Sequence, residues 1–107
     1  MISKESIARK GLARVTFELP SCLWAGRVNL VGEFNNWDGL VTPMTQDPFD
    51  ENWRVTVDLE SGRRYRFRYL VDGQEMLNDC QADDHVENPQ GLYDPVVDLT
   101  KFGESPS

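Results

Sequence analysis

A tryptophan stands inside a polar turn in the stretch LVGEFNNWDG, residues 30–39. The stretch begins as an apolar strand and continues into residues 35–39, whose Asn, Asp and Gly tolerate the positive φ of tight turns. A tryptophan this close to a turn either plugs the end of a sheet or offers its ring to a ligand. Both interpretations of Trp37 stay open on this pattern alone.

The charged residues are unevenly distributed along the chain. Four arginines crowd residues 63–68, whereas residues 72–98 hold eight acids and neither Lys nor Arg. The net charge of −7 disfavours nucleic acid and anionic membrane surfaces, because Lys and Arg drive phosphate binding. We interpret the arginines as a basic strand face beside an acidic loop, solvated and partly paired.

Motifs of catalysis and metal binding are not found. A glycosidase needs two carboxylates about 5–10 Å apart across a cleft, and a domain of 107 residues offers little cleft. No serine stands in a nucleophile elbow, the acids after residue 78 match no EF-hand, and Cys22, Cys80 and His85 match no zinc pattern. We therefore expect a protein that is not an enzyme and has no cofactor or metal site.

Short alternating strands are expected to position these residues. Apolar alternation predicts strands over 13–19, 27–34, 53–59, 63–71, 75–77 and 96–99, with a short edge strand near 41–45. Residues 2–10 are expected to form a helical turn or to stay loose, and residues 78–95 to form a loop long enough to suggest a role. Frequent turns without a long helix favour an antiparallel β-sandwich of about seven strands.

A chain of 107 residues suits a single domain. We expect an N-terminal extension over 1–11, the sandwich over 12–100 and a flexible tail over 101–107. The two cysteines make no disulfide framework, and the charged N-terminus lacks the apolar stretch of a secretory signal. These features favour a cytoplasmic protein.

The ordered set LVGEFNNWD, PM, NWRVTVDLESGRRYRFRYLVDG and ND resembles carbohydrate-binding module family 48, the isoamylase N-terminal or early-set domain. This family includes the glycogen-binding domain of AMP-activated protein kinase β subunits, and the likeness is greatest to small stand-alone prokaryotic members. The resemblance covers nearly the whole chain. It implies an immunoglobulin-like sandwich that binds α-1,4-linked glucan (glycogen, starch or maltodextrin) in glycogen or starch metabolism.

The resemblance also implies which residues contact the sugar. Trp37 matches the family's first platform tryptophan, whose flat ring covers the apolar C–H face of a pyranose. Arg68 matches a lysine that bonds sugar hydroxyls in the kinase-subunit domains, and Arg keeps this charge in a rigid fork of donors. Asn36 and Asn78 complete the expected contacts, although Asn78 also belongs to a loop whose side chains are expected to bond its own backbone.

Two family positions differ here. The second platform tryptophan falls at Glu75 or Met76, depending on the motif from which it is counted, and we expect Met76 to be a softer platform. A sugar-contacting asparagine falls at Asp94, which cannot donate a hydrogen bond when it is ionised. Weak glucan binding is the expected function. The alternative is an interaction or regulatory domain that has lost the sugar site and binds a glucan-processing enzyme or a regulatory protein.

Overall fold

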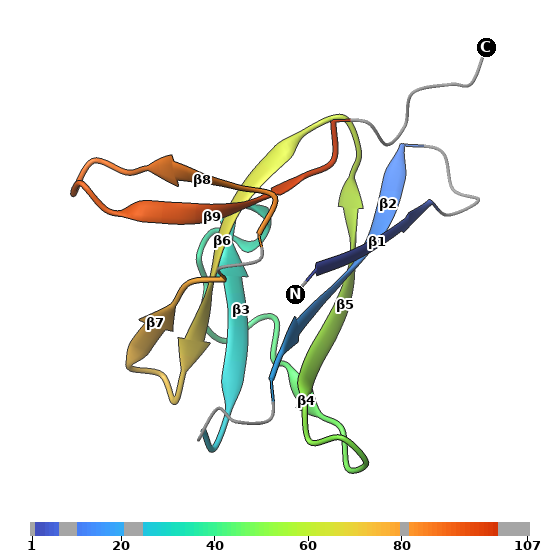
Figure 1. Ribbon diagram of the computed structural model, residues 1–107, viewed down its shortest axis with the longest axis vertical. Helices are drawn as coiled ribbons and strands as arrows, with labels where there is room; N and C mark the ends of the chain where they lie inside the picture. Colours follow the sequence, from blue (N-terminus) through green and yellow to red (C-terminus); the bar gives the residue numbers. More distant parts are fainter. Residues whose placement is uncertain (1, 7–10, 21–24, 80–81, 101–107) are drawn as a thin grey trace.

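Two antiparallel sheets form a sandwich in the computed structural model, which describes residues 2–6, 11–20, 25–79 and 82–100 (Figure 1). The first sheet has the order β1 (Ile2–Ser6), β2 (Leu12–Leu19), β5 (Trp53–Glu60) and β4 (Thr45–Gln46). The second has the order β3 (Val28–Gly32), β6 (Arg64–Val71), β9 (Tyr93–Asp98) and β8 (Asp84–Glu87), with β7 (Glu75–Leu77) also paired to β6. The predicted sandwich is confirmed, with nine strands in the described residues rather than about seven.

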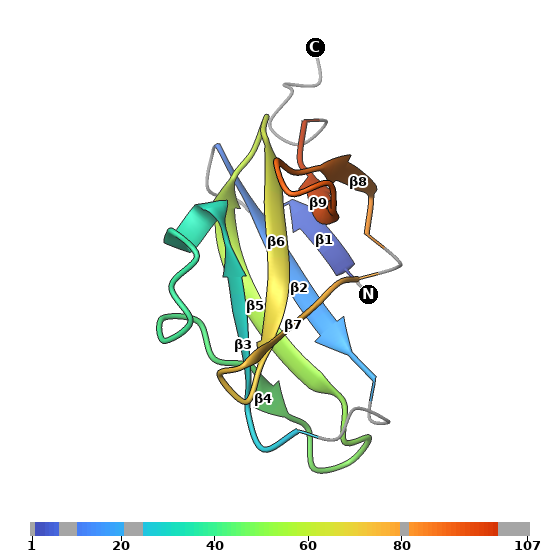
Figure 2. The same ribbon diagram turned by 90° about the vertical axis from the view of Figure 1, so that its left-hand side faces the viewer.

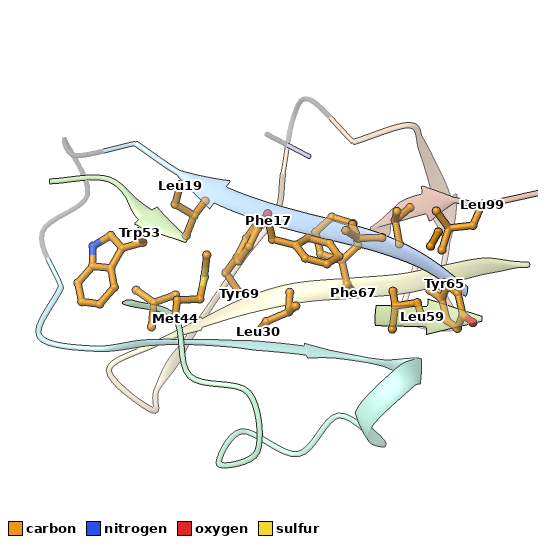
Figure 3. Close-up of a cluster of buried hydrophobic side chains, with 14 of the residues drawn as sticks. Phe17, Leu19, Leu30, Met44, Trp53, Leu59, Tyr65, Phe67, Tyr69 and Leu99 are labelled. Carbon is orange, nitrogen blue, oxygen red and sulfur yellow. The ribbon is translucent and has the colours of Figure 1, made fainter. Parts of the chain in front are cut away.

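The core lies between the two sheets and follows the predicted alternation. Among the described residues, the inward faces of β2 and β6 supply eight of the fifteen buried residues of the core, and Figure 3 shows the largest of its side chains. The Phe17 and Phe67 rings meet edge to face at 5.0 Å between centroids, and Phe67 meets Tyr69 in the same way at 5.6 Å. Edge contacts of this kind add to the free energy gained by burying the rings.

The N-terminal segment corrects one prediction. Residues 2–6 form strand β1, paired antiparallel with β2, where a helical turn or a loose segment was expected. Ile2 is its only large apolar residue, so the alternating signal was too weak to identify a strand. Lys4 connects β1 to the other sheet. Its Nζ lies 2.6 Å from an Asp83 carboxylate oxygen and donates to the Asp98 carbonyl at 3.1 Å.

Three further predicted boundaries are wrong. The expected loop 78–95 contains β8 and the first residues of β9, because β8 and β9 pair as a hairpin. The strand expected over 27–34 ends at Gly32, and Phe34 lies in the 3₁₀ turn η1 (Glu33–Asn35). The edge strand expected at 41–45 is β4, residues 45–46, while residues 42–44 run beside β3.

Some expectations fall outside the described part of the chain. These are Cys22, Cys80, residues 7–10 of the N-terminal extension and the tail 101–107. Within the described residues, no helix has the length and apolar character needed to cross a membrane.

Strand β6 organises the outer face of the second sheet. Its odd-numbered residues Tyr65 to Val71 face the core, so the even-numbered Arg64, Arg66, Arg68 and Leu70 face outward. Figure 2 shows β6 at the centre of this face, with η1 on one side of its first half and the β8–β9 hairpin on the other. The turn that holds Trp37 follows η1 directly.

Candidate functional site

The turn at residues 35–38 fixes Trp37 in an uncommon backbone conformation. The Asp38 amide donates to the Asn35 carbonyl at 3.1 Å, and the two central residues, Asn36 and Trp37, have φ of 56° and 59°. Asparagine adopts this region readily, whereas a bulky residue there costs about 1–3 kcal/mol. The Trp37 amide donates to the Gly32 carbonyl at 2.9 Å, and its side chain is 39% exposed. Trp37 is therefore only partly buried, in a turn that the surrounding chain holds.

Asn35 is the residue that holds this turn. Its Oδ1 accepts the Gly32 amide at 3.0 Å, and its Nδ2 donates to the Leu30 carbonyl at 2.9 Å and to Thr42 Oγ1 at 3.1 Å. These bonds join the end of β3 to the returning segment near Thr42. Sequence reasoning counted Asn35 only as a turn residue, because its three partners are not recognisable from local spacing.

Replacing Asn35 by alanine is expected to lower the free energy of unfolding by about 1–3 kcal/mol, because part-buried groups lose their partners. Urea unfolding measures this change. Asn36→Gly is the control, since Asn36 is exposed and glycine suits its φ of 56°; we expect a change within about 0.5 kcal/mol. Equal losses in both variants would contradict this role for Asn35.

The Trp37 turn is in contact with the outer face of β6. A Cβ atom placed on Gly39 would lie 2.5 Å from Leu70 Cδ2, so the chain at Gly39, directly after the turn, packs against the Leu70 side chain. Met76 of β7 stands opposite Leu70 and is 44% exposed, so it shares this face. Glu75 stands opposite the core residue Val71 and faces the other side. Of the two positions considered for the second platform, the outer face therefore holds Met76.

Arg68 is the next outward residue along β6, and it is already paired. Its Nη2 lies 2.8 Å from Oδ1 of Asp94, and the two side chains are 18% and 10% exposed. Extending the β6–β9 register from Arg66↔Val96 by two residues places Arg68 opposite Asp94. Asn88 Nδ2 also donates to Asp94 Oδ1, at 3.2 Å. Arg68 and Asp94, which stand where the resemblance implies a lysine and an asparagine, thus form one largely buried ion pair.

The two predicted asparagines border this surface. Asn36 is exposed beside Trp37, and Asn78 is exposed directly after β7. The next residue, Asp79, is buried and accepts a hydrogen bond from the Tyr69 hydroxyl at 2.9 Å. Burial, with the charge of Asp79 and this bond, raises the pKa of the Tyr69 hydroxyl well above its usual value. The hydrogen bond between Asp79 and Tyr69 therefore connects the chain after β7 to the core, while the Asn78 side chain is at the surface.

A family model describes this chain. Residues 14–87 match carbohydrate-binding module 48, the isoamylase N-terminal domain. The chain belongs to this family. A search of curated proteins returned no match to the module.

The segment that matches the family model includes Trp37, Arg68, Met76 and Asn78, and it ends before Asp94. The Arg68–Asp94 ion pair thus joins a residue inside the matched segment to one beyond it. The family match supports carbohydrate binding as the general role of the module, and a carbohydrate-binding module is a non-catalytic domain.

Proposed function

We propose that the outer face around Trp37, Met76 and Arg68 binds α-1,4-linked glucan. The observation that carries this proposal is the half-exposed Trp37 ring, held in a strained turn that touches the outer face of β6. Backbone strain of this kind persists where the surrounding structure enforces it, and it gathers at ligand sites. A preorganised ring loses little conformational freedom when a sugar stacks on it.

Each residue has a distinct role in this proposal. The Trp37 ring covers the apolar C–H face of one glucose, and Met76 covers part of a second as a soft platform. Asn36 and Asn78 offer exposed amides to the hydroxyl groups, because each amide both donates and accepts. Arg68 contributes only the donors that Asp94 leaves free. The site has one aromatic platform, and its cation Arg68 is already paired with Asp94. We therefore expect weak binding, with a Kd of about 10 µM to 1 mM.

Replacing Trp37 by alanine is expected to weaken glycogen and maltoheptaose binding at least about tenfold, or ~1.4 kcal/mol. Calorimetric titration with maltoheptaose and gel retardation by glycogen measure this loss. Phe49→Ala is the matched control, because Phe49 is an aromatic residue on the loop before β5 and is 96% exposed. We expect it to bind like the unaltered module. Equal affinity of the Trp37 and Phe49 variants would remove Trp37 from the site.

The Arg68–Asp94 ion pair favours a second candidate function, an interaction or regulatory domain that has kept the fold and lost the sugar site. Such a domain would bind a glucan-processing enzyme or a regulatory protein. Asp94→Asn separates the two candidates, because it releases Arg68 and adds an amide donor. Under the glucan proposal this variant binds maltoheptaose at least as tightly as the unaltered module. Absence of binding in both chains would favour the second candidate.

The wider setting of the module follows from its ligand. A protein that binds glycogen or starch acts beside the enzymes that build and degrade these polymers. We place this chain in the cytoplasm in the metabolism of storage glucan, with a glucan-processing enzyme as its nearest protein partner. Finding the protein in a glycogen-particle fraction of its source cells, and losing it after amylase treatment, would support this placement.

A further inference from the structure

An open groove lies on the same outer sheet but at the other end of β6, between η1 and the β8–β9 hairpin (Figure 2). Its volume is about 230 Å³, and its lining comprises Glu33, Arg64, Tyr65, Arg66, Val86 and Val96. The candidate glucan surface uses the second half of β6, from Arg68 onward. The groove shares none of that surface's proposed contact residues.

Arg66 distinguishes this groove from the rest of the charged surface. It is half-buried, and its guanidinium forms no ion pair or hydrogen bond with any residue that the structure describes. The exposed Arg27 is the other described cation without an ion pair. All remaining described cations are paired, namely Lys4, Arg14, Arg54, Arg63, Arg64 and Arg68. In a chain of net charge −7, an unpaired and partly desolvated arginine marks a place that favours an anion.

The neighbours of Arg66 define which anion fits. Glu33 accepts the Arg66 backbone amide at 2.7 Å through its carboxylate, and Arg64 is paired with both Asp84 and Asp98. These three carboxylates disfavour a doubly charged phosphate more strongly than a singly charged group, because like charges repel in proportion to their magnitude. The groove therefore favours a singly charged anion, such as a carboxylate, over a phosphate.

The remaining walls favour an aliphatic stem behind that carboxylate. Val86 and Val96 lie on adjacent strands of the hairpin and line the groove, and the half-buried Val86 offers more apolar surface than Val96, which is 2% exposed. The volume is below the roughly 300–1,000 Å³ of pockets that enclose a complete small ligand. One side chain with methylenes and a terminal carboxylate, as in glutamate, matches this size and polarity.

We propose that this groove docks an acidic segment of a partner protein, with a glutamate carboxylate on Arg66 and its methylenes over Val86 and Val96. The charge complementarity is local: Arg66 is the unpaired cation among the residues that line the groove, and the glutamate carboxylate supplies its counter-charge. The contact is small and partly wet, so a weak and salt-sensitive association is expected. Sugar binding at Trp37 is not required for it.

Titration of the ¹⁵N-labelled chain with the peptide acetyl-Glu-Val-Glu-Val-Glu-amide tests the proposal. We expect amide shifts at Arg64–Arg66, Val86 and Val96. Arg66→Gln should weaken the apparent affinity at least about fivefold. Arg27→Gln is the matched control, since it removes the same charge from another unpaired arginine, and it should leave the affinity unchanged. Arg66→Lys, which keeps the charge and the fold, should retain most of the binding.

Several outcomes would overturn the proposal. One is equal weakening by the Arg66→Gln and Arg27→Gln changes, which would indicate a general charge effect. Equal binding of the peptide in which each glutamate is replaced by glutamine would remove the carboxylate from the contact. Shifts of the groove residues by inorganic phosphate alone, or by maltoheptaose alone, would assign the groove to a free anion or to glucan. Absence of any shift at millimolar peptide would also exclude the docking site.

Discussion

Replacing Arg68 by methionine is expected to lower the free energy of unfolding by about 2–4 kcal/mol. The methionine keeps an apolar stem on β6, but it leaves the Asp94 carboxylate, only 10% exposed, with Asn88 as its remaining described partner. An unpaired buried charge is costly because the water that it lost is not replaced by a partner. Chemical denaturation of the purified variant measures this loss.

A double-mutant cycle separates the ion pair from the loss of packing. Asp94→Leu is also expected to be destabilising, because it removes the partner of Arg68. The chain with both changes should be more stable than the sum of the two losses predicts, by about 1–3 kcal/mol. Strict additivity of the two losses would show that the ion pair makes no separate contribution.

Raising the pH above about 10 is expected to destabilise the module through Tyr69, whose unfolded-state pKa is near 10. Tyr69 is fully buried and donates to Asp79, so its folded-state pKa lies well above that of the unfolded chain. Below pH 10 both states hold the proton, and the stabilisation is complete. As the pH rises further, the unfolded chain loses the proton first, and the free energy of unfolding falls by about 1.4 kcal/mol per pH unit.

Tyr69→Phe isolates this effect from the other groups that titrate at alkaline pH. At pH 7 the variant should be less stable by about 1–3 kcal/mol, because Asp79 loses a buried hydrogen bond. Above pH 10 the difference between the two proteins should shrink, since phenylalanine has no proton to lose. A difference that stays constant from pH 8 to pH 11.5 would contradict a raised pKa for Tyr69.

The strands with strong alternation could be predicted from the sequence, and those that depend on pairing could not. Phe17 and Phe67 belong to regular apolar patterns, so β2 and β6 were identified nearly to the residue. Strand β1 has one large apolar residue, and its contacts are its pairing with β2 and the ion pair of Lys4 with Asp83 across the sandwich. Strand β8 has a similarly weak pattern, and its pairing with β9 defines it. Such non-local contacts have no signature in a short window of sequence.

The candidate site shows the same division between local and distant information. The polar turn around Trp37 was recognisable, because Asn, Asp and Gly mark positions of positive φ. Its support by Asn35 depends on Thr42, and the neutralisation of Arg68 depends on Asp94, which is 26 residues further along the chain. From the sequence, the position of the second platform could be either Glu75 or Met76. The β6–β7 register places Met76, rather than Glu75, on the outer face.

The position of Trp37 now has a physical explanation. It is not buried as a plug, and the turn that holds it touches Leu70 through Gly39. Met76 lies beside Leu70, so apolar side chains face outward next to the turn that holds Trp37, where we propose that a glucan chain crosses the sheet. The Arg68–Asp94 ion pair leaves this surface with fewer free donors. We therefore expect a glucan site that depends mainly on stacking and binds weakly.

Titration of the ¹⁵N-labelled module with maltoheptaose tests glucan binding at Trp37. We expect saturable shifts of the Trp37 indole and of the amides of Asn36, Leu70 and Met76, with a Kd of about 10 µM to 1 mM. Residues of the groove around Arg66 should not shift. Absence of shifts around Trp37 at several times the upper limit of this Kd, about 1 mM, would contradict glucan binding at this surface.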